Sequence, residues 1–389
     1  MKKIIFIIII TLSVSHVFSQ NTESIVSQVA KNNPSLQALA KSNIADSLGN
    51  RTDIYLQNPE IGFDYLFGSP VAIGNRTGIS VSQSFDFPTA YLYKSQISDL
   101  KNEQLNNSYH KKYREIVLQA KLICTDLIYY NLLIKEYEKR YEHAQKIATA
   151  YKSKYDIGDA SIIAFNKAQL NKLNTEKELE NLQIEKNALL NELVGLNGNI
   201  PISFNDTIFY GKQIPLNFEQ WYAGAESRNP LLKWLKLEIE LSEKQSKLNM
   251  AQSLPKFSAG YMSEITKGEN FQGITVGISL PLWANKNKVK YAKLKTEATQ
   301  NYENASKLKY YNLLKTLHAK AVALQKSVDA YNSNLQMYNN SKLLYKALEK
   351  GELDLINYIM ELSFYYESYR NLLDMKRELY KVVAEMYQY

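Results

Sequence analysis

Four stretches of the chain alternate between apolar and small or polar residues, and they come in two pairs. In residues 273–283, GITVGISLPLW, the apolar positions fall on every second residue. This period of two predicts a strand with one apolar face and one wet face. Turn-rich loops at 68–77 and 266–272 separate the members of each pair, which predicts two β-hairpins. The strands are expected at residues 60–67, 78–87, 256–265 and 273–282.

Each predicted strand is about ten residues long, which is the length that a tilted strand needs to cross a bilayer. Taken alone, the strands fit equally well a pair of hairpins on a protein surface or in a sandwich. The wet faces carry small side chains that would suit the water-filled lumen of a barrel. The expected lumen residues are Ser80, Ser82, Ser84, Thr275 and Ser279.

The rest of the chain has a helical pattern. Apolar residues recur every three or four positions, as at Ile116, Ala120 and Ile123, and the average step close to 3.5 is typical of coiled-coil packing. About seventy residues separate Pro88 from Gly158, so an unbroken helix there would be roughly 100 Å long. A similar length precedes Gly351, and the two glycines are expected to mark the turns of two helical arms.

The chain is predicted to be a tandem duplication. Several landmarks recur in the same order at nearly one spacing, and this spacing defines a first repeat over 20–215 and a second over 216–389. Each repeat is expected to run helix, hairpin, long helix, glycine break and long helix. The recurring landmarks are Asn33-Pro34 with Asn229-Pro230, Pro59 with Pro255, the strands, and Gly158 with Gly351.

The N-terminus predicts export. Residues 1–19 combine Lys2 and Lys3 with an apolar run and small residues near Ser19, the pattern of a cleaved secretory signal. No later stretch approaches eighteen uninterrupted apolar residues, so strands rather than helices are expected to enter any membrane.

Composition and charge exclude an internal disulfide and argue against nucleic-acid binding. Cys124 is the only cysteine, which excludes an internal disulfide. The formal charge of +8 arises from basic residues interleaved with acidic ones along the helices, as in KELENLQIEK. This pattern is typical of a solvated helix face, and together with export it argues against nucleic acid.

Four strands cannot close a barrel, and an open sheet edge cannot sit in lipid. Bacterial membrane barrels begin at about eight strands. Two copies of the chain would supply about eight strands, whose interior is filled by side chains, and three would supply about twelve, which can leave a water channel. The small polar lining favours a homo-trimer, with a dimer as the second option.

These features together resemble the TolC family of outer-membrane efflux proteins over essentially the whole mature chain. The resemblance is carried by the repeated Asn-Pro helix starts, the strand end SLPLW at 279–283, the turn at Tyr155 to Gly158, the Gly351 turn and the helix end LLNELVGLNG at 189–198. It implies a mainly α fold with a β-barrel part, formed by a trimer with a twelve-stranded outer-membrane barrel and an α-helical periplasmic tunnel. It also implies an exit duct that docks a periplasmic adaptor protein and an inner-membrane transporter. The short chain looks most like the branch that serves cation-efflux pumps.

The resemblance implies roles for the two glycine turns. In the family, such tips bind the adaptor and carry the gate. The matching docking positions here are Gly158, Asp159, Ile162, Gly351, Glu352 and Leu355. The charges that the family often places near the tips are replaced by Ala164, Leu353 and Asn357. Asp354, Asn357 and Glu361 are the candidate gate residues instead, and the alternative is that they are solvated side chains at the start of a helix.

No catalytic machinery is predicted. The three histidines after the signal, His110, His143 and His318, lack a second ligand at metal-binding spacing, and no phosphate loop or nucleophile motif stands out. We therefore expect a passive conduit with no cofactor, which conducts metal cations or small molecules. Two alternatives remain: a periplasmic coiled-coil structural or adaptor protein, and a type I secretion duct for proteins.

Overall fold

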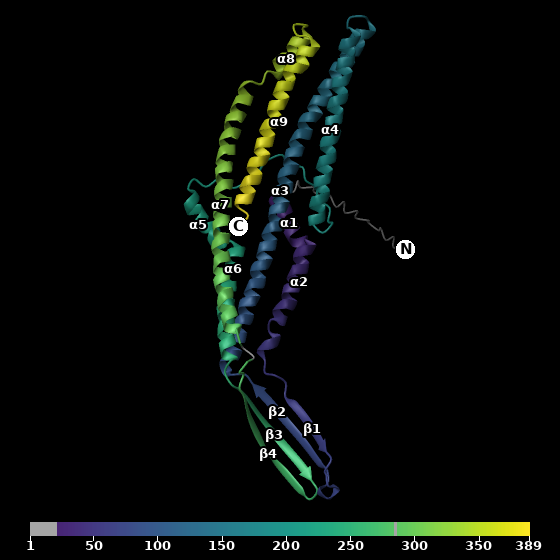
Figure 1. The fold of residues 1–389 in the computed structure, drawn as a ribbon. Coiled ribbons are helices and arrows are strands. Elements are labelled where there is room, and N and C mark those ends of the chain that lie inside the picture. The colour runs from purple at the N-terminus through teal and green to yellow at the C-terminus, as the bar shows by residue number, and fades with distance from the viewer. Residues whose placement is uncertain (1–21, 284–285) are drawn as a thin grey trace, which may run out of the picture. The chain divides into compact units, whose positions relative to one another are not determined.

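The computed structural model describes residues 22–283 and 286–389. The predicted signal, residues 1–19, lies outside the described residues. The chain consists of helices and two hairpins in the predicted order (Figure 1). The first half contains α1 (Thr22–Asn32), α2 (Pro34–Gly49), β1 (Glu60–Leu66), β2 (Arg76–Phe85), α3 (Pro88–Asp156) and α4 (Ile162–Leu196). The second half contains α5 (Phe218–Arg228), α6 (Pro230–Ala251), β3 (Lys256–Thr266), β4 (Glu269–Ser279), α7 (Lys288–Met337), α8 (Ser341–Glu349) and α9 (Leu355–Met386).

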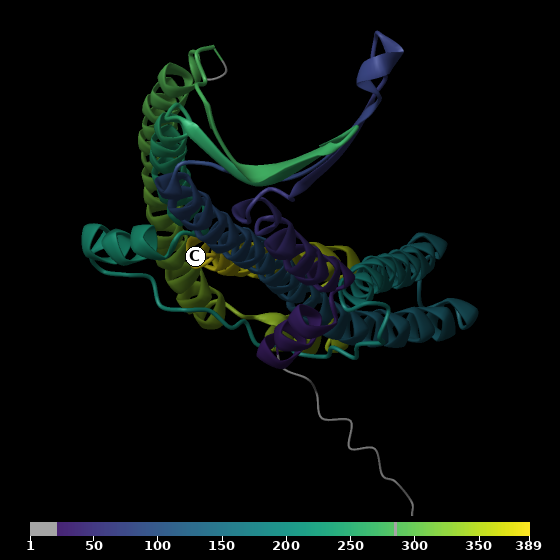
Figure 2. The same ribbon diagram turned by 90° about the horizontal axis from the view of Figure 1, so that it is seen from below.

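The four strands form one antiparallel sheet in the order β1-β2-β3-β4. The central β2–β3 pair joins the hairpin of the first half to that of the second, and the sheet is curved (Figure 2). The predicted bounds of β4 were wrong, because the strand begins at Glu269 and not at 273. Thr266 pairs directly with Glu269, which leaves only Lys267 and Gly268 in the turn. Gly268 has a φ of +91°, a conformation that glycine adopts without steric cost.

The first long arm is one helix, as predicted, but the second is not. Helix α3 runs for 69 residues, whereas α7 ends at Met337 and α8 begins at Ser341. At this break the side-chain oxygen of Asn339 accepts hydrogen bonds from the backbone nitrogen and the hydroxyl of Ser341, at 3.2 and 2.7 Å. Such local hydrogen bonds compete with the helical ones, so the YNNS segment interrupts the arm.

Both Asn-Pro pairs stand at helix starts, as expected from the duplication. Helix α6 begins at Pro230, and the Asn229 side chain accepts hydrogen bonds from the backbone nitrogens of Leu231 and Leu232 at 2.9 and 3.4 Å. Proline suits this position because its missing N–H has no helical partner there. Helix α2 likewise begins at Pro34.

The chain divides into two compact units that are described separately. Among the described residues, unit 1 contains 22–33, 117–212 and 323–384, and unit 2 contains 34–116, 213–283, 286–322 and 385–389. Unit 1 holds the two glycine turns, and unit 2 holds the sheet. Each unit draws segments from both predicted repeats, so the repeat boundary near residue 215 stays a prediction from the sequence.

Packing inside each unit is mainly between helices. In unit 1, Leu355, Tyr358 and Leu362 of α9 pack with Ile147 of α3 and Ala168 of α4. In unit 2, an aromatic cluster forms around Phe218, Tyr222 and Tyr311. Among the described helices, α3 alone contains an 18-residue window apolar enough to cross a membrane by composition, and more than half of that window is buried in the protein. Burial against neighbouring helices accounts for that apolar window.

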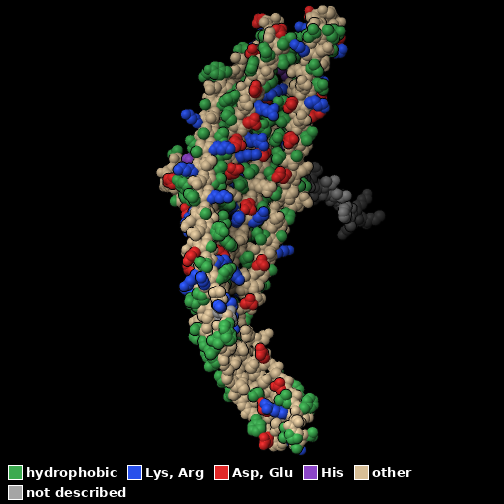
Figure 3. Space-filling model, in the orientation of Figure 1, with side chains coloured by type: hydrophobic (Ala, Val, Ile, Leu, Met, Phe, Trp, Pro, Cys, Tyr) green, Lys and Arg blue, Asp and Glu red, His purple; other side chains and the backbone are tan. Residues whose placement is uncertain are grey.

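Charged side chains of both signs lie interspersed along the visible face of the helices (Figure 3). Several charged side chains of the helices form ion pairs one helical turn apart, such as Lys152 with Asp156 and Lys177 with Glu180. Exposed pairs of this kind contribute little stability individually. They keep the long helices solvated, as the interleaved sequence pattern predicts.

The close approach of β2 to β3 predicts a position where even one methyl group is not tolerated. A Cβ at Gly260 would lie 2.5 Å from the backbone oxygen of Val81, which cannot move without breaking the ladder. We expect Gly260→Ala to lower the unfolding free energy by about 1–3 kcal/mol, measured by thermal unfolding in mild detergent. Gly273→Ala is the matched control, because a Cβ there meets nothing within 4 Å. Equal effects of the two changes would contradict the packing described.

Candidate functional site

The sheet has one face of small and polar side chains. Residues directly paired across strands point to the same side of a sheet, and the register places all five expected lumen residues on one face. Glycines lie beside the hydroxyls there: a Cβ at Gly62 would lie 2.6 Å from the Ser80 Oγ, and one at Gly277 would lie 2.5 Å from the Ser258 Oγ. Arg76 and Glu264 form an ion pair on the same face. The five lumen residues Ser80, Ser82, Ser84, Thr275 and Ser279 share this face with Gly62, Ser258, Gly260, Gly273 and Gly277, and the large apolar side chains of the face are Leu66, Met262 and Phe271.

The opposite face is mostly apolar, with Thr77, Gln83, Ser263, Asn270 and Gln272 as its polar residues. Its large side chains come from all four strands, and none of those named below is covered by another described part of the chain. An apolar surface of this extent marks a region that contacts lipid or another protein. The exposed apolar residues of this face are Ile61, Phe63, Tyr65, Ile79, Val81, Phe257, Tyr261, Ile265, Ile274, Val276 and Ile278.

Both edges of the sheet are open in the described chain. Strand β1 pairs only with β2, and β4 pairs only with β3. Their outward backbone groups therefore offer hydrogen bonds to a further strand. Such edges cannot remain unpaired in hydrocarbon, because no water is there to satisfy them.

A buried carboxylate connects the sheet to the helices. Asp86 follows β2, its side chain is 7% exposed, and its oxygens lie 2.9 Å from both Lys94 Nζ on α3 and Lys256 Nζ at the start of β3. The Tyr91 hydroxyl accepts a hydrogen bond from the Asp86 backbone nitrogen at 3.0 Å. Burial acts to raise the pKa of the Asp86 carboxyl, but the hydrogen bonds and charges of the two lysines outweigh it, and the pKa is lowered.

The two glycine turns have the same backbone structure. At the first, Gly158 N bonds to Tyr155 O at 3.0 Å and Asp159 N bonds to Lys154 O at 2.8 Å. At the second, Gly351 N bonds to Leu348 O at 3.2 Å and Glu352 N bonds to Ala347 O at 2.9 Å. This pair of bonds is the Schellman motif, which needs a left-handed residue, and the two glycines have φ values of +79° and +73°. The glycines therefore end the helices, as the sequence predicts.

The helix that follows each turn begins with a capping side chain at the equivalent position. The Ser161 Oγ accepts a hydrogen bond from the Ala164 nitrogen at 3.2 Å, and an Asp354 oxygen accepts from the nitrogens of Ile356 and Asn357 at 2.8 and 3.0 Å. These hydrogen bonds lower the pKa of the Asp354 carboxyl, with the bond from Asn357 the largest cause. Asp354 thus holds the start of α9, while Asn357 and Glu361 are exposed.

The expected docking residues differ in exposure. Gly158, Asp159, Gly351 and Glu352 are exposed, and the Ile162 side chain is 47% exposed. Leu355 stands at the equivalent position of the second turn but is only 3% exposed, because it packs into the core of unit 1. Leu355 therefore belongs to the core of unit 1, and its expected part in docking stays a prediction.

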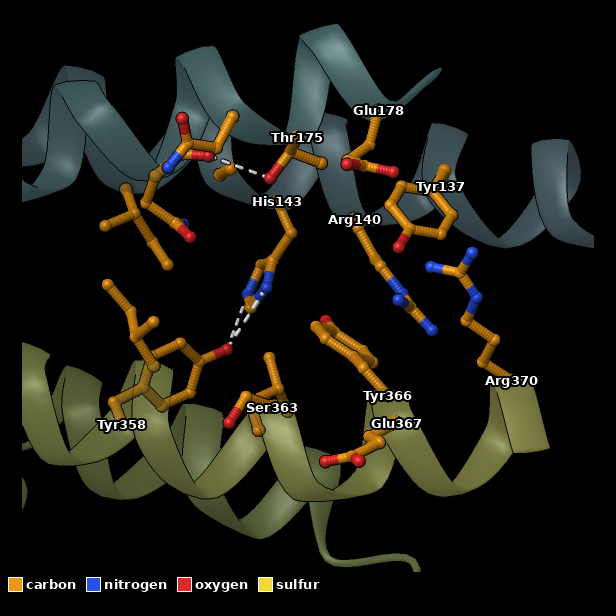
Figure 4. A pocket seen from close by; sticks show the side chains of 16 residues that line it. Tyr137, Arg140, His143, Thr175, Glu178, Tyr358, Ser363, Tyr366, Glu367 and Arg370 are labelled. Atoms are coloured by element: carbon orange, nitrogen blue, oxygen red, sulfur yellow. Dashed lines mark hydrogen bonds between the residues drawn. The ribbon is translucent and has the colours of Figure 1, made fainter. Parts of the chain in front are cut away.

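Sequence analysis missed a pocket of about 400 Å³ between α3, α4 and α9 in unit 1 (Figure 4). The Tyr358 hydroxyl lies 3.1 Å from Nδ1 of His143, and the guanidinium of Arg140 lies 3.6 Å from the centre of the Tyr366 ring. Burial, followed by the charge of Lys146, lowers the pKa of His143, which favours its neutral form. Contacts between residues more than two hundred positions apart leave no local signal in the sequence.

Polar and charged side chains make up most of the pocket lining, beside the rings of Tyr137, Tyr358 and Tyr366 and four aliphatic residues. The Arg140 Nε lies 3.3 Å from the Glu136 Oε1, so the charge of Arg140 is partly balanced by its own helix. Within residues 22–283 and 286–389, no group of three or more His, Cys, Asp and Glu side chains could hold a metal ion. Burial raises the pKa of the Cys124 thiol to about 12, so this thiol is unreactive at neutral pH.

The chain has the fold of outer-membrane channels of known structure. The structure of CusC, described in connection with folding and transmembrane channel formation, is 13% identical and covers 95% of this chain and 92% of its own, with a TM-score of 0.78. The CmeC outer-membrane channel of Campylobacter jejuni is 13% identical, with 95% and 85% coverage and a TM-score of 0.75. The open-state MtrE outer-membrane channel of Neisseria gonorrhoeae is 12% identical, with 95% and 88% coverage and a TM-score of 0.70.

No protein-family model matches the chain, and no curated protein sequence matches it either. The likeness to the three channels is therefore one of structure and not of sequence. It confirms the fold that the resemblance to the TolC family implies: a mainly α chain with long helices and two hairpins.

The Asp86 junction predicts a pH-dependent contribution to stability. Because the folded-state pKa of Asp86 is lowered, its contribution is present above the unfolded value near 4 and is lost as pH falls through the folded-state pKa. We expect Asp86→Asn to reduce the unfolding free energy by about 1–3 kcal/mol at pH 7, less than for a fully buried pair, because Lys256 can turn to solvent. The difference from the unmodified protein should shrink in thermal unfolding below about pH 4.

The control for this experiment is Asp99→Asn, since Asp99 is exposed on α3 and forms no ion pair within the described chain. We expect it to change stability by less than about 0.5 kcal/mol at either pH. A loss in Asp86→Asn that stays constant down to pH 3 would show that packing, and not charge, accounts for it.

Proposed function

We propose that the protein is the outer-membrane channel of a tripartite efflux system. The observation that carries this proposal is the two-faced sheet: one face on which serine, threonine, glycine and charged side chains predominate, an opposite face on which exposed apolar side chains predominate, and two edges unpaired in the described chain. Contact with water would solvate the polar face, and contact with lipid would cover the apolar face. The shared fold with outer-membrane channels supports this reading.

The open edges support a closed ring of identical chains. In such a ring β4 of one chain pairs with β1 of the next, a head-to-tail contact that repeats until the ring closes. Three chains would supply about twelve strands, enough for a water-filled interior, whereas two would give about eight and a filled one. The small side chains of the polar face favour the trimer, with these serines and threonines lining the lumen.

The long helices would extend the conduit into the periplasm, as the resemblance to the TolC family implies. Adaptor docking is assigned to Gly158, Asp159, Ile162, Gly351 and Glu352 at the two turns, which are exposed. The inner-membrane transporter would feed the channel through this assembly. The gate at the periplasmic end of the conduit would be lined by Asp354, Asn357 and Glu361. The Asp354 side chain is restrained there, because it caps the N-terminus of α9.

The protein would act by passive conduction of metal cations or small molecules, without catalysis or a cofactor. The structural neighbours are channels, which supports a non-enzymatic role. A type I secretion duct has the same architecture and is a second candidate. A periplasmic coiled-coil adaptor is less well supported, because its hairpins would not need eleven exposed apolar side chains on one face.

The two faces of β4 test this function. We expect Val276→Asp or Ile278→Asp to block assembly in the outer membrane, because each places a charge on the face assigned to lipid, at a cost somewhat below the about 2–4 kcal/mol of a lysine or arginine at the bilayer midplane. Thr275→Asp and Ser279→Asp change neighbouring residues on the face assigned to water and should be tolerated. The measurement is the amount of protein in outer-membrane fractions and the detergent-corrected mass of the extracted complex.

Three chains in the extracted complex would support the trimeric channel. Equal assembly defects on both faces would argue against the barrel. A detergent-free soluble monomer would remove the barrel and the efflux function together, and would leave the periplasmic coiled-coil protein.

Docking at the first turn has its own test. Ile162→Asp puts a charge on an exposed apolar side chain, so we expect efflux to fall at least about tenfold while the mass and melting temperature of the complex stay unchanged. Ile184→Asp is the control, because Ile184 is also exposed on α4 but lies six helical turns from the tip. Normal efflux in Ile162→Asp, measured as resistance of cells to the exported compound, would remove Ile162 from the docking surface.

A further inference from the structure

Lysines gather where the second hairpin meets its helices in unit 2. Residues 270–296 contain five lysines and no acidic residue, and residues 244–263 contain three more, again without an acidic residue. This departs from the interleaved charges of the other helices. Four of these lysines are exposed, one just before α7 and three in its first turns; they are called here the α7 basic segment, Lys286, Lys288, Lys290 and Lys293.

Carboxylates balance some of the neighbouring lysines but not this segment. Lys256 pairs with Asp86, and Lys295 pairs with Glu238, each at 2.9 Å. In the described part of the chain, no carboxylate oxygen lies within 4.0 Å of a lysine of the α7 basic segment. The segment therefore presents four positive charges to its surroundings.

The start of α7 is fixed beside the sheet. The Asn249 Nδ2 donates a hydrogen bond to the Lys288 carbonyl at 3.1 Å, and the Ser242 Oγ donates one to the Ala292 carbonyl, also at 3.1 Å. Both donors lie on α6, which leads into β3, and Ala292 is buried. The lysines are therefore held at the helical end of the hairpin by the helix pair that carries it.

The chain between the sheet and these lysines is apolar and aromatic. Leu280, Leu282 and Trp283 follow β4 and are exposed, and Tyr291 is exposed within the basic segment. From β4 onward the surface thus changes from aliphatic to aromatic to cationic. Membrane proteins show this order from the hydrocarbon region, through the interface where tryptophan and tyrosine gather, to the headgroups.

We propose that the α7 basic segment binds the phosphates of anionic phospholipids in the inner leaflet of the membrane that the sheet enters. This inference rests on the proposed function, because it needs the apolar face in lipid. The first repeat offers no equivalent: early in α3, Lys94 pairs with Asp86, and Lys101 lies between Asp99 and Glu103. The lipid contact is therefore a property of the second repeat, repeated once per chain around the ring.

The test compares lipids that differ in headgroup charge. The purified complex in nonionic detergent is titrated with dioleoylphosphatidylglycerol or dioleoylphosphatidylcholine, and binding is followed by the rise in melting temperature. We expect at least about tenfold tighter binding of the anionic lipid, and we expect added salt to weaken it. Changing all four lysines to glutamine, Lys286→Gln, Lys288→Gln, Lys290→Gln and Lys293→Gln, should abolish this preference.

The matched control removes the same charge elsewhere. Lys167→Gln, Lys309→Gln, Lys326→Gln and Lys342→Gln change four exposed lysines outside the basic stretches, and this variant should keep the preference. The proposal is overturned if both variants lose it equally, if the first variant keeps it, or if soluble glycerol 3-phosphate produces the same rise. An equal rise with glycerol 3-phosphate would indicate a site for soluble phosphate compounds and not for lipid.

The failure of this proposal is distinguishable from failure of the channel. Carbonate extraction of membranes and the mass of the complex report whether the sheet enters a bilayer at all. The lipid site is supported if the variant with all four lysines of the α7 basic segment changed to glutamine stays in the membrane with unchanged mass but no longer prefers the anionic lipid. Membrane-embedded protein without any headgroup preference overturns the lipid site alone, and protein absent from membranes overturns both.

Discussion

The backbone hydrogen bonds of the sheet are the constraint on which the rest of the structure depends. Four strands satisfy each other internally but leave one row of donors and acceptors on β1 and another on β4. In water such edges invite aggregation, and in lipid they are not viable. One face of the sheet also carries eleven exposed apolar side chains, so a single chain leaves both the edges and this face without a partner in the described structure. Closure with further copies would pair these edges and turn the apolar face outward, so the proposed oligomer rests on the sheet more directly than on the helices.

The duplication places equivalent backbones in different surroundings. Both turns use the same Schellman hydrogen bonds and a glycine in the left-handed region. The next helix begins in each case with a capping side chain, Ser161 or Asp354. Yet Ile162 is half exposed, whereas Leu355 is buried among residues of α3 and α4. Local sequence therefore determines the turn, while the packing of whole helices determines which turn has side chains available to a partner.

This difference explains which features could be predicted from sequence. The strands were found because period two is a local signal, and the registers then placed all five expected lumen residues on one face. The start of β4 was missed because Asn270 and Gln272 do not look like strand residues, although pairing with Ile265 and Ser263 makes them so. The break after α7 was missed because an apolar periodicity continues through it. The burial of Leu355 and the pocket at His143 depend on contacts between distant segments and have no local signature.

The charges of the chain divide into three groups with different consequences. Along the helices, opposite charges alternate and largely cancel, which leaves a solvated surface. At Asp86 one buried carboxylate is balanced by two lysines, Lys94 of α3 and Lys256 of β3. Because α3 belongs to the first predicted repeat and β3 to the second, these two ion pairs join the repeats at the helical end of the sheet. At the start of α7 the cations lack such a partner within the described chain, although carboxylates are common elsewhere. Self-repulsion among four nearby lysines is unfavourable, so their persistence at this single level of the fold is best explained by an external negative charge, and the apolar face beside them indicates that this charge belongs to a membrane surface.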